Sequence, residues 1–314
     1  MAGVTDVRID TLDHVEPADV RVLLDLVTAA VDADGRRPLS EHTELHLKRG
    51  GDRPARHVLA RRADGAVIGY AHVDPSDPVE GAAAELVVHP ASRRRGLGRA
   101  LVKAAEAATV DGRLRLWAHG DHPAAALLSQ SLGYQRIRSL WLMRRDLSVP
   151  LPSVELPAGV VLRAFRPGDD DEAWLGVNTR AFADHPEQGL WTLLDLHRRM
   201  HEQWFDASGF LVAVDAGTGE MLGFHWTKVH GGPAGNGHGH EPIGEVYVVG
   251  VDPAAQGRRL GRVLTLAGLH HLQDAGLRTV ILYVESDNVP ALKVYTDLGF
   301  VHVDTDVMYQ RTLP

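Results

Sequence analysis

Apolar and polar positions follow the same order twice along the chain. In each half, an early strand and helix precede a β-hairpin through Ile68 or Leu222, and a long apolar strand follows through Val87 or Val249. Each half continues with an amphipathic helix, a second apolar strand, another helix and a last strand. Strands that alternate with helices in this way predict an α/β fold, in which a mixed sheet is flanked by helices on both faces.

Short matching segments indicate that the two halves are copies of one domain. The pairs are Ile68-Gly69-Tyr70 with Leu222-Gly223-Phe224, His89-Pro90 with Asp252-Pro253, and Leu132-Gly133-Tyr134 with Leu298-Gly299-Phe300. They occur in the same order in both halves, which favours duplication over chance. A proline-rich stretch over residues 146–160 is typical of a linker. We therefore predict one domain over residues 1–148, a linker over 149–158 and a second domain over 159–314.

Composition narrows the class of protein. The chain has 314 residues, a net charge of −8 and no cysteine. The acidic balance argues against a nucleic-acid partner, and no apolar stretch approaches the roughly 20 residues that span a membrane. The first ten residues do not resemble a signal peptide, so we expect a cytoplasmic protein and a monomer. Without cysteine there are no disulfides and no thiolate ligands, and any acyl transfer is expected to be direct.

A loop with three arginines predicts an anion site. Arg93-Arg94-Arg95-Gly96-Leu97-Gly98 lies between an apolar strand and an amphipathic helix. Unpaired N–H groups and the helix dipole favour an anion at such a helix start, and glycine permits close approach of a pyrophosphate. The loop returns in the second half as Gln256-Gly257-Arg258-Arg259-Leu260-Gly261, where Arg259 replaces the middle glycine.

These loops resemble the signature of the GNAT acetyltransferase superfamily, Arg/Gln-x-x-Gly-x-Gly/Ala after a bulged strand. The resemblance implies acetyl-CoA as cosubstrate and no metal. Gly250, within the strand that ends at Asp252-Pro253, is consistent with the bulge. In the superfamily this bulge splays two strands, pantetheine pairs with the open backbone, and an N–H near Val249 polarises the thioester. The implied cofactor-binding residues are Leu86, Val87, Val88, Arg94, Arg95, Gly96, Leu97, Gly98, Arg99, Val249, Gly250, Val251, Gln256, Gly257, Arg258, Arg259, Leu260, Gly261, Arg262, Asn288, Val289, Pro290, Ala291, Leu292 and Lys293.

The two copies differ in titratable groups. Aligning the dipeptides that contain Pro90 and Pro253 places Ala82 opposite Glu245, and aligning the Leu-Gly-aromatic segments places Ser129 opposite Tyr295. Glu85 falls opposite Val248 and projects differently from Glu245. We therefore predict that the second copy is catalytic, with Glu245 as general base and, as the resemblance implies, Tyr295 near the cofactor sulfur as general acid. The first copy is expected to bind acetyl-CoA without chemistry.

Further segments of the second half resemble the mycothiol synthase family, a tandem branch of the superfamily. They include residues 181–189, 223–230, 244–247 and 282–288. This resemblance implies acetylation of the cysteinyl amine of cysteinyl-glucosaminyl-inositol. It also implies that the acceptor is contacted by Glu41, Glu187, Lys228, Glu245 and Tyr283.

Other interpretations stay open at this point. The acceptor is alternatively another amine, such as an aminoglycoside or a protein N-terminus, or the chain is a non-catalytic acetyl-CoA sensor. The glycine- and histidine-rich stretch over residues 230–241 invites a metal-site interpretation. Its glycine density makes ordering costly, so we expect a mobile hairpin loop there.

Overall fold

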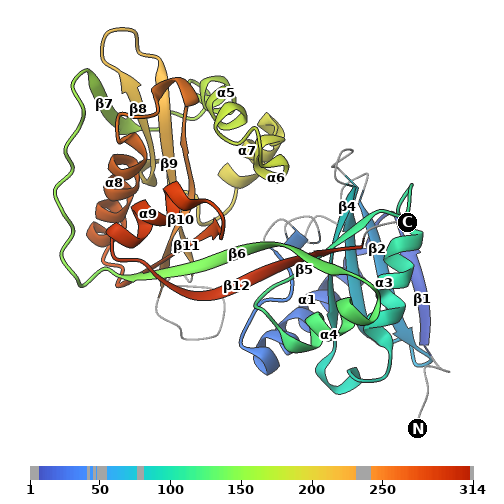
Figure 1. The fold of residues 1–314 in the computed structure, drawn as a ribbon. Helices are drawn as coiled ribbons and strands as arrows, with labels where there is room; N and C mark the ends of the chain where they lie inside the picture. The colour runs from blue at the N-terminus through green and yellow to red at the C-terminus, as the bar shows by residue number, and fades with distance from the viewer. Residues whose placement is uncertain are drawn as a thin grey trace. The chain divides into compact units, whose positions relative to one another are not determined.

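The computed structural model describes residues 7–40, 43–44, 47, 55–75, 81–230 and 242–311, and for Pro186 and Glu187 only the backbone. Contacts divide the chain into two units, residues 1–140 with 304–314 and residues 141–303. Each unit is a sheet with helices packed on it (Figure 1). The α/β fold predicted from the repeated pattern is therefore confirmed.

The first unit starts with a helix and an antiparallel meander. Its elements are β1 (Val7–Leu12), α1 (Pro17–Asp34), β2 (Arg56–Arg62), β3 (Val67–Asp74), β4 (Ala82–Val88), the short 3₁₀ helix η1 (Pro90–Ser92), α3 (Leu97–Ala107), β5 (Leu114–Ala118), α4 (Pro123–Ser131) and the start of β6 (Gln135–Asp146). The strand order is β1-β2-β3-β4-β5-β12, and β4 pairs with β5 in parallel. Residues of α1 pack in one apolar core, and residues of α3 pack in another with β5.

The second unit repeats this arrangement. Its elements are β7 (Val160–Ala164), α5 (Asp171–Ala181), α6 (Pro186–Gly189), α7 (Leu193–Met200), η2 (Ala207–Gly209), β8 (Phe210–Asp215), β9 (Met221–His230), β10 (Ile243–Val251), η3 (Pro253–Ala255), α8 (Leu260–Asp274), β11 (Thr279–Glu285), α9 (Val289–Asp297) and the start of β12 (Val301–Gln310). The strand order is β6-β11-β10-β9-β8-β7. Helices α8 and α9 cover one face of this sheet, and α5 to α7 cover the other (Figure 1).

The two halves exchange parts of their last strands. Residues 307–310 of β12 pair antiparallel with residues 115–118 of β5, inside the first unit. Conversely, Met143 on β6 and Leu147 just beyond it lie in the apolar core of the second unit, and the Arg145 guanidinium donates to the carbonyl of Leu298. The predicted limits, 1–148 and 159–314, follow the chain in order and omit this exchange. The local pattern of apolar residues can predict that a segment forms a strand, but it does not show which sheet that strand joins.

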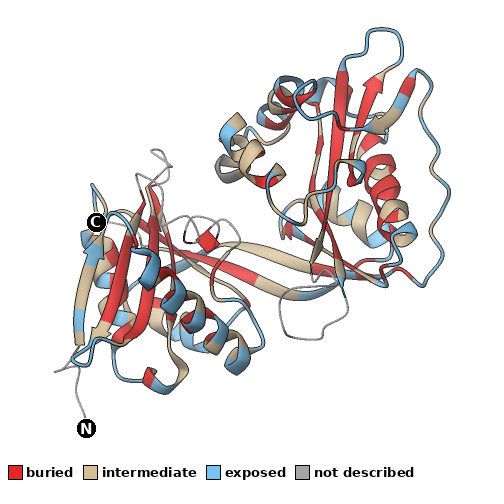
Figure 2. Ribbon diagram, turned by 180° about the vertical axis from the view of Figure 1, so that it is seen from behind, coloured by how far each residue is buried: buried red, intermediate tan, exposed pale blue. Residues whose placement is uncertain are grey.

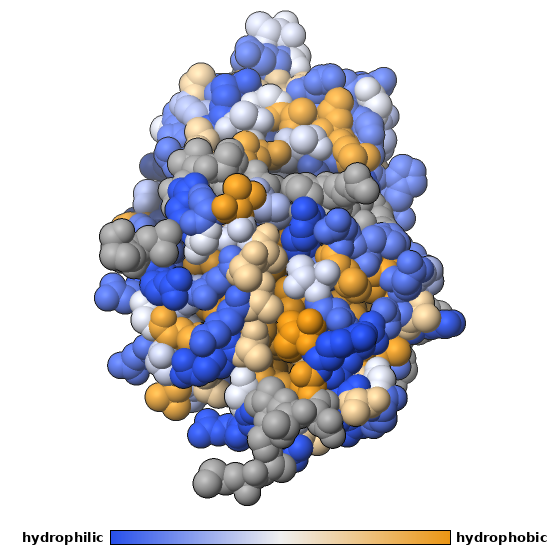
Figure 3. All heavy atoms as spheres, turned by 90° about the vertical axis from the view of Figure 1, so that its right-hand side faces the viewer, coloured by the Kyte–Doolittle hydropathy of each residue, from blue (hydrophilic) through white to orange (hydrophobic). Residues whose placement is uncertain are grey.

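Buried residues concentrate in the strands and on the helix faces that meet them (Figure 2). The core of the second unit is strongly aromatic on the side of α5 and α7, where Trp174, Phe210, Phe224 and Trp226 are all fully buried. On the face drawn in Figure 3, hydrophobic side chains lie interspersed among hydrophilic ones. Across the described ranges, no helix has both the length and the apolar content to cross a membrane.

Candidate active site

The two arginine-glycine loops have one backbone shape. In the first, Arg94 and Gly96 are left-handed with φ of 62° and 84°. In the second, Gly257 and Arg259 occupy the equivalent positions with φ of 80° and 60°. Helices α3 and α8 start directly after Gly96 and Arg259. Arg259 thus adopts the conformation of the glycine that it replaces, at a cost of roughly 1–2 kcal/mol, and the loop keeps its shape.

An arginine–aspartate pair ties the approach to each loop to the first helix region of its unit. Arg93 donates to both carboxylate oxygens of Asp34 at 2.7 and 2.6 Å, and to the carbonyl of Val88 at 3.1 Å. In the second unit Arg180 on α5 donates to Asp252 at 2.6 and 2.8 Å. The Arg93 guanidinium therefore has a structural role, because these hydrogen bonds use it to hold Asp34 and Val88 together. The backbone N–H groups at the start of α3 and α8 are the expected phosphate donors.

The first unit holds a cavity of about 520 Å³ beside its loop. Eight of the predicted cofactor-binding residues line it: Leu86, Val87, Val88, Arg94, Gly96, Leu97, Gly98 and Arg99. Arg95 is exposed on the same loop. The lining also includes residues that sequence reasoning missed, among them Arg36, Trp117, His119, His122 and Tyr309. Tyr309 reaches this cavity because the end of β12 joins the first unit.

A β-bulge interrupts the ladder between β9 and β10. The β9–β10 ladder shifts register between Val246 and Val248, so Tyr247 is an extra residue. The corresponding β3–β4 ladder runs from Asp74–Ala83 to Gly69–Val88 without a shift. Counting from the matched glycines of β3 and β9, Glu245 corresponds to Ala83, one residue from the predicted Ala82. The first copy therefore has no carboxylate at the position of Glu245. Glu85 corresponds to Val248, as predicted from the sequence.

The bulge reverses which side chains share a face. Val246 and Val249 pack with α8 and α9, whereas Tyr247 and Val248 pack with the aromatic core under α5 and α7. Side chains alternate along a strand, so Glu245 lies on the same face as Tyr247. The parallel ladder between β10 and β11 extends from Gly244–Val280 to Val246–Leu282. The two strands therefore pair around Glu245, and the predicted residues Val249, Gly250 and Val251 lie on β10 beyond the end of this ladder.

Tyr247 is fixed by a cluster of aromatic rings and a buried arginine. Its hydroxyl accepts a hydrogen bond from Nε of Arg199 at 2.7 Å. Arg199 is itself buried and stacks 3.7 Å above the ring of Trp191. The Tyr247 ring packs edge-on against Trp204 and Trp226. These contacts hold the bulged residue in place from α7.

Glu245 is buried and is paired with a histidine. Its Oε2 lies 2.6 Å from Nε2 of His230, and the two side chains are 9% and 41% exposed, respectively. Lys228 is directly opposite Glu245 in the ladder. Its ammonium is buried over the rings of Trp204 and Tyr247 at 4.7 and 5.1 Å. Lys228, His230 and Glu245 thus share the face toward α7.

Tyr295 lies on α9 and packs with the apolar core that contains Val246 and Val249, on the face opposite to Glu245. Its ring contacts Phe300 edge-on. Burial around the hydroxyl raises the pKa of Tyr295 to about 12, although the side chain as a whole is only partly buried. Asn288, one of the predicted cofactor-binding residues, caps α9 by accepting from the N–H of Ala291 at 3.2 Å. Tyr283 is exposed on β11.

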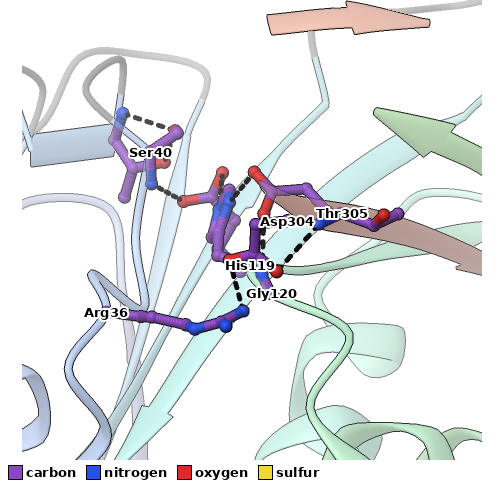
Figure 4. Close-up of polar contacts among 9 residues, drawn as sticks. Arg36, Ser40, His119, Gly120, Asp304 and Thr305 are labelled. Carbon is purple, nitrogen blue, oxygen red and sulfur yellow. Dashed lines mark hydrogen bonds and ion pairs between the residues drawn. The ribbon is translucent and has the colours of Figure 1, made fainter. Parts of the chain in front are cut away.

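In the first unit the one carboxylate of β4, Glu85, belongs to a buried ionic network. His119 lies between two carboxylates, 2.9 Å from Asp306 and 3.3 Å from Glu85. The backbone N–H of Ser40 donates to Glu85 at 2.7 Å, and that of Gly120 donates to Asp306 at 2.7 Å (Figure 4). The carboxylates raise the pKa of His119 to about 10. Although burial opposes ionisation, the charge of His119 and its hydrogen bond lower the pKa of Glu85 to about 2. Glu85 is therefore held ionised by permanent partners.

Comparison with known proteins agrees with this geometry. Residues 177–300 match the acetyltransferase (GNAT) family model and residues 54–136 match a GNAT acetyltransferase domain model. Mycothiol acetyltransferase of Acidothermus cellulolyticus is 54% identical over 313 residues, which cover 97% of this chain and 95% of the relative. That of Salinispora arenicola is also 54% identical and covers 97% of both chains. This chain belongs to the mycothiol acetyltransferase family. Among solved structures, a tandem GNAT protein from the clavulanic acid biosynthesis pathway has the same fold, with a TM-score of 0.71, 22% identity and coverage of 97% of this chain and 98% of that one.

The remaining predicted residues lie at the starts of two helices, on α6 or outside the described residues. Gln256, Gly257, Arg258, Leu260, Gly261 and Arg262 surround the start of α8, and Val289, Pro290, Ala291, Leu292 and Lys293 form the start of α9. Glu187 lies on α6, and Glu41 lies outside the described residues. Most of the glycine- and histidine-rich stretch, residues 231–241, also lies outside them. The sequence analysis assigned no role to His230, Arg199 or Tyr247. For His230, the sequence signal that could have found its pairing with Glu245 was the diagonal position of the two residues across a β-hairpin.

Proposed function

We propose that the protein transfers the acetyl group of acetyl-CoA to the cysteinyl amine of cysteinyl-glucosaminyl-inositol, the last step of mycothiol synthesis. The name shared by its relatives, mycothiol acetyltransferase, supports this reaction. The structural observation that carries the proposal is the bulge at Tyr247. Beside the bulge, the buried carboxylate of Glu245 lies on one face of β10, and Tyr295 on α9 packs on the opposite face.

In this mechanism the phosphates of acetyl-CoA bind the N–H groups at the start of α8, and the pantetheine arm runs along β10 beyond the bulge. The thioester then lies between the two faces. The backbone N–H near Val249 donates to its carbonyl oxygen, which becomes negative when the amine attacks. The left-handed Arg259 preserves the loop shape that this requires.

The acceptor amine approaches on the face of Glu245. An α-amino group with a pKa near 8 is deprotonated readily near neutral pH, and Glu245 takes the proton directly or through water. Attack on the carbonyl carbon forms the C–N bond, and collapse of the intermediate breaks the C–S bond. Tyr295 stabilises the departing thiolate with a hydrogen bond. With a tyrosine pKa of about 12 against about 8.5 for a thiol, complete proton transfer is uphill by roughly 5 kcal/mol, so it follows bond breaking.

Contacts to the acceptor are part of the same proposal. Carboxylates accept hydrogen bonds from an ammonium and from hydroxyl groups, which suits Glu187 and Glu245, and on the same resemblance Glu41. Lys228 and Tyr283 are proposed as further contacts. We also propose that the protein acts as a cytoplasmic monomer without nucleic-acid or membrane partners. The net charge of −8 supports this.

The first unit is proposed to bind acetyl-CoA without turning it over. Its loop and 520 Å³ cavity support binding. Ser129 takes the place of Tyr295, and Glu85 is committed to His119 and Ser40, which argues against chemistry. Calorimetry is expected to find two acetyl-CoA sites, and a single site confined to the second unit would contradict this part.

The acceptor assignment is tested by turnover of acetyl-CoA with cysteinyl-glucosaminyl-inositol beside its des-cysteinyl analogue. We expect acetylation of cysteinyl-glucosaminyl-inositol only, with the transferred acetyl group on the cysteinyl nitrogen. Equal rates on both compounds would reject the proposed acceptor.

A further inference from the structure

His230 is the group that connects the buried base to solvent. Glu245 is 9% exposed, whereas His230 at the end of β9 is 41% exposed, and their Nε2 and Oε2 atoms lie 2.6 Å apart. The pair is diagonal in the antiparallel ladder, because Lys228 stands opposite Glu245 and His230 stands opposite Ile243. Diagonal neighbours are within reach of long side chains on one face.

The proposed reaction needs such a connection. An ammonium acceptor loses two protons on becoming an amide, and the coenzyme A thiolate takes up one of them. One proton per turnover must therefore leave the site. Tyr295 handles the thiolate on the other face of the sheet, so the excess proton collects at Glu245.

We infer that His230 carries this proton from Glu245 to solvent. With the neutral ring of His230 protonated on Nδ1, the carboxylic acid of Glu245 gives its proton to Nε2, and the proton on Nδ1 then passes to water or buffer. Proton exchange with solvent returns the ring to its Nδ1–H form before the next turnover. Charge and atoms balance, because the imidazole gains one proton and loses one in each turnover. Histidine suits the task, since its two ring nitrogens can accept on one side and donate on the other.

The charges around His230 are compatible with this role. In the described strands that pack beside it, Glu245 and Tyr247 on β10 and Lys228 on β9 are ionisable groups of the same face. The Lys228 ammonium is directed over Trp204 and Tyr247.

The test uses the full-length protein with His230→Gln. Glutamine still donates a hydrogen bond to Glu245 but transfers no proton, so it separates a relay from mere positioning. Steady-state acetyl transfer to cysteinyl-glucosaminyl-inositol, which requires Glu245 to lose its proton in every cycle, is measured in dilute buffer, together with the Kd for acetyl-CoA and the melting temperature. We expect a rate loss of about 10-fold or more, an unchanged Kd, and recovery as imidazole is added, because general acid–base steps contribute about 10²–10⁴-fold. His270→Gln is the matched control, since His270 is only partly buried and bonds only the carbonyl of Pro152 in the described structure.

Two results would overturn the relay: a His230→Gln rate within twofold of the wild type, or a lower rate that imidazole does not raise. His230→Asn gives a second variant if glutamine perturbs folding. The inference rests on the proposed function, and Glu245→Gln separates the two. If Glu245→Gln retains the wild-type rate, the proposed chemistry fails. If it loses activity while His230→Gln does not, only the relay fails.

Discussion

Asp306 ties the end of the chain to the first unit, and its loss is predicted to weaken that unit specifically. The residue lies on the exchanged part of β12 and is 8% exposed. Its carboxylate accepts from the N–H of Gly120 at 2.7 Å and faces Nδ1 of His119 at 2.9 Å. Asp306→Ala removes both contacts and leaves a buried N–H and a buried imidazolium with one partner fewer.

The magnitude follows from these contacts. Removing one partner of a buried ion pair costs about 3–5 kcal/mol, and the lower end applies because Glu85 still faces His119 at 3.3 Å. We therefore expect about 3 kcal/mol. For a unit of this size each kcal/mol lowers the melting temperature by about 2–4 °C, so the transition of the first unit should fall by about 6–12 °C.

The effect also has a defined pH window. The folded pKa of His119 is raised from 6.5 to about 10, so its stabilisation is complete below pH 6.5 and is lost as the pH rises through 10. The folded pKa of Glu85 is lowered from 4.5 to about 2, so its stabilisation is complete above pH 4.5 and is lost as the pH falls to 2. The network thus contributes most between pH 4.5 and 6.5. Calorimetric melts of wild type and Asp306→Ala at pH 5.5 and 9.5 check this. A difference below 1 kcal/mol at pH 5.5, or a larger difference at pH 9.5, would refute the reasoning.

Three further outcomes concern the second unit. Gly268→Ala should destabilise it by about 2 kcal/mol in urea unfolding despite the better helix propensity of alanine, because an added Cβ would lie 2.0 Å from the ring of His225. Gly176→Ala in α5 would meet only the flexible end of Arg180 and should instead stabilise the unit by up to about 1 kcal/mol. Burial lowers the pKa of His225 from 6.5 to about 4, so stabilisation that is present above pH 6.5 is lost as the pH falls. The free energy of unfolding should drop by about 2 kcal/mol between pH 7 and pH 5, and a His225→Asn variant should not show this pH dependence. Arg259→Gly should raise the unfolding free energy by about 1 kcal/mol, since it relieves a left-handed arginine at φ 60°, and calorimetry should find acetyl-CoA affinity within a few-fold of the wild type.

Much of this molecule could be predicted from sequence because the informative signals are local. The glycine loops, their preceding strands and the cap at Asn288 depend on residues close together in the chain. The position of Gly250 led to the expectation of a bulge, but the extra residue is Tyr247, and only the ladder reveals that Ala83 rather than Ala82 matches Glu245.

The features that were missed depend on distant pairings. Asp306 meets His119 from 187 positions away because β12 crosses into the first unit. Arg199 meets Tyr247 across 48 residues. Neither pairing leaves a periodic signal, since periodicity reports which face a residue occupies and not what packs against it.

The claim that the second unit performs the chemistry is tested most directly by single-turnover acetyl transfer in Glu245→Gln and Tyr295→Phe, with acetyl-CoA binding measured in parallel. The account predicts that Glu245→Gln loses about 100-fold or more and Tyr295→Phe about 10-fold or more, while both variants bind acetyl-CoA as the wild type does. Wild-type transfer rates in the combined Glu245→Gln/Tyr295→Phe protein would contradict the account.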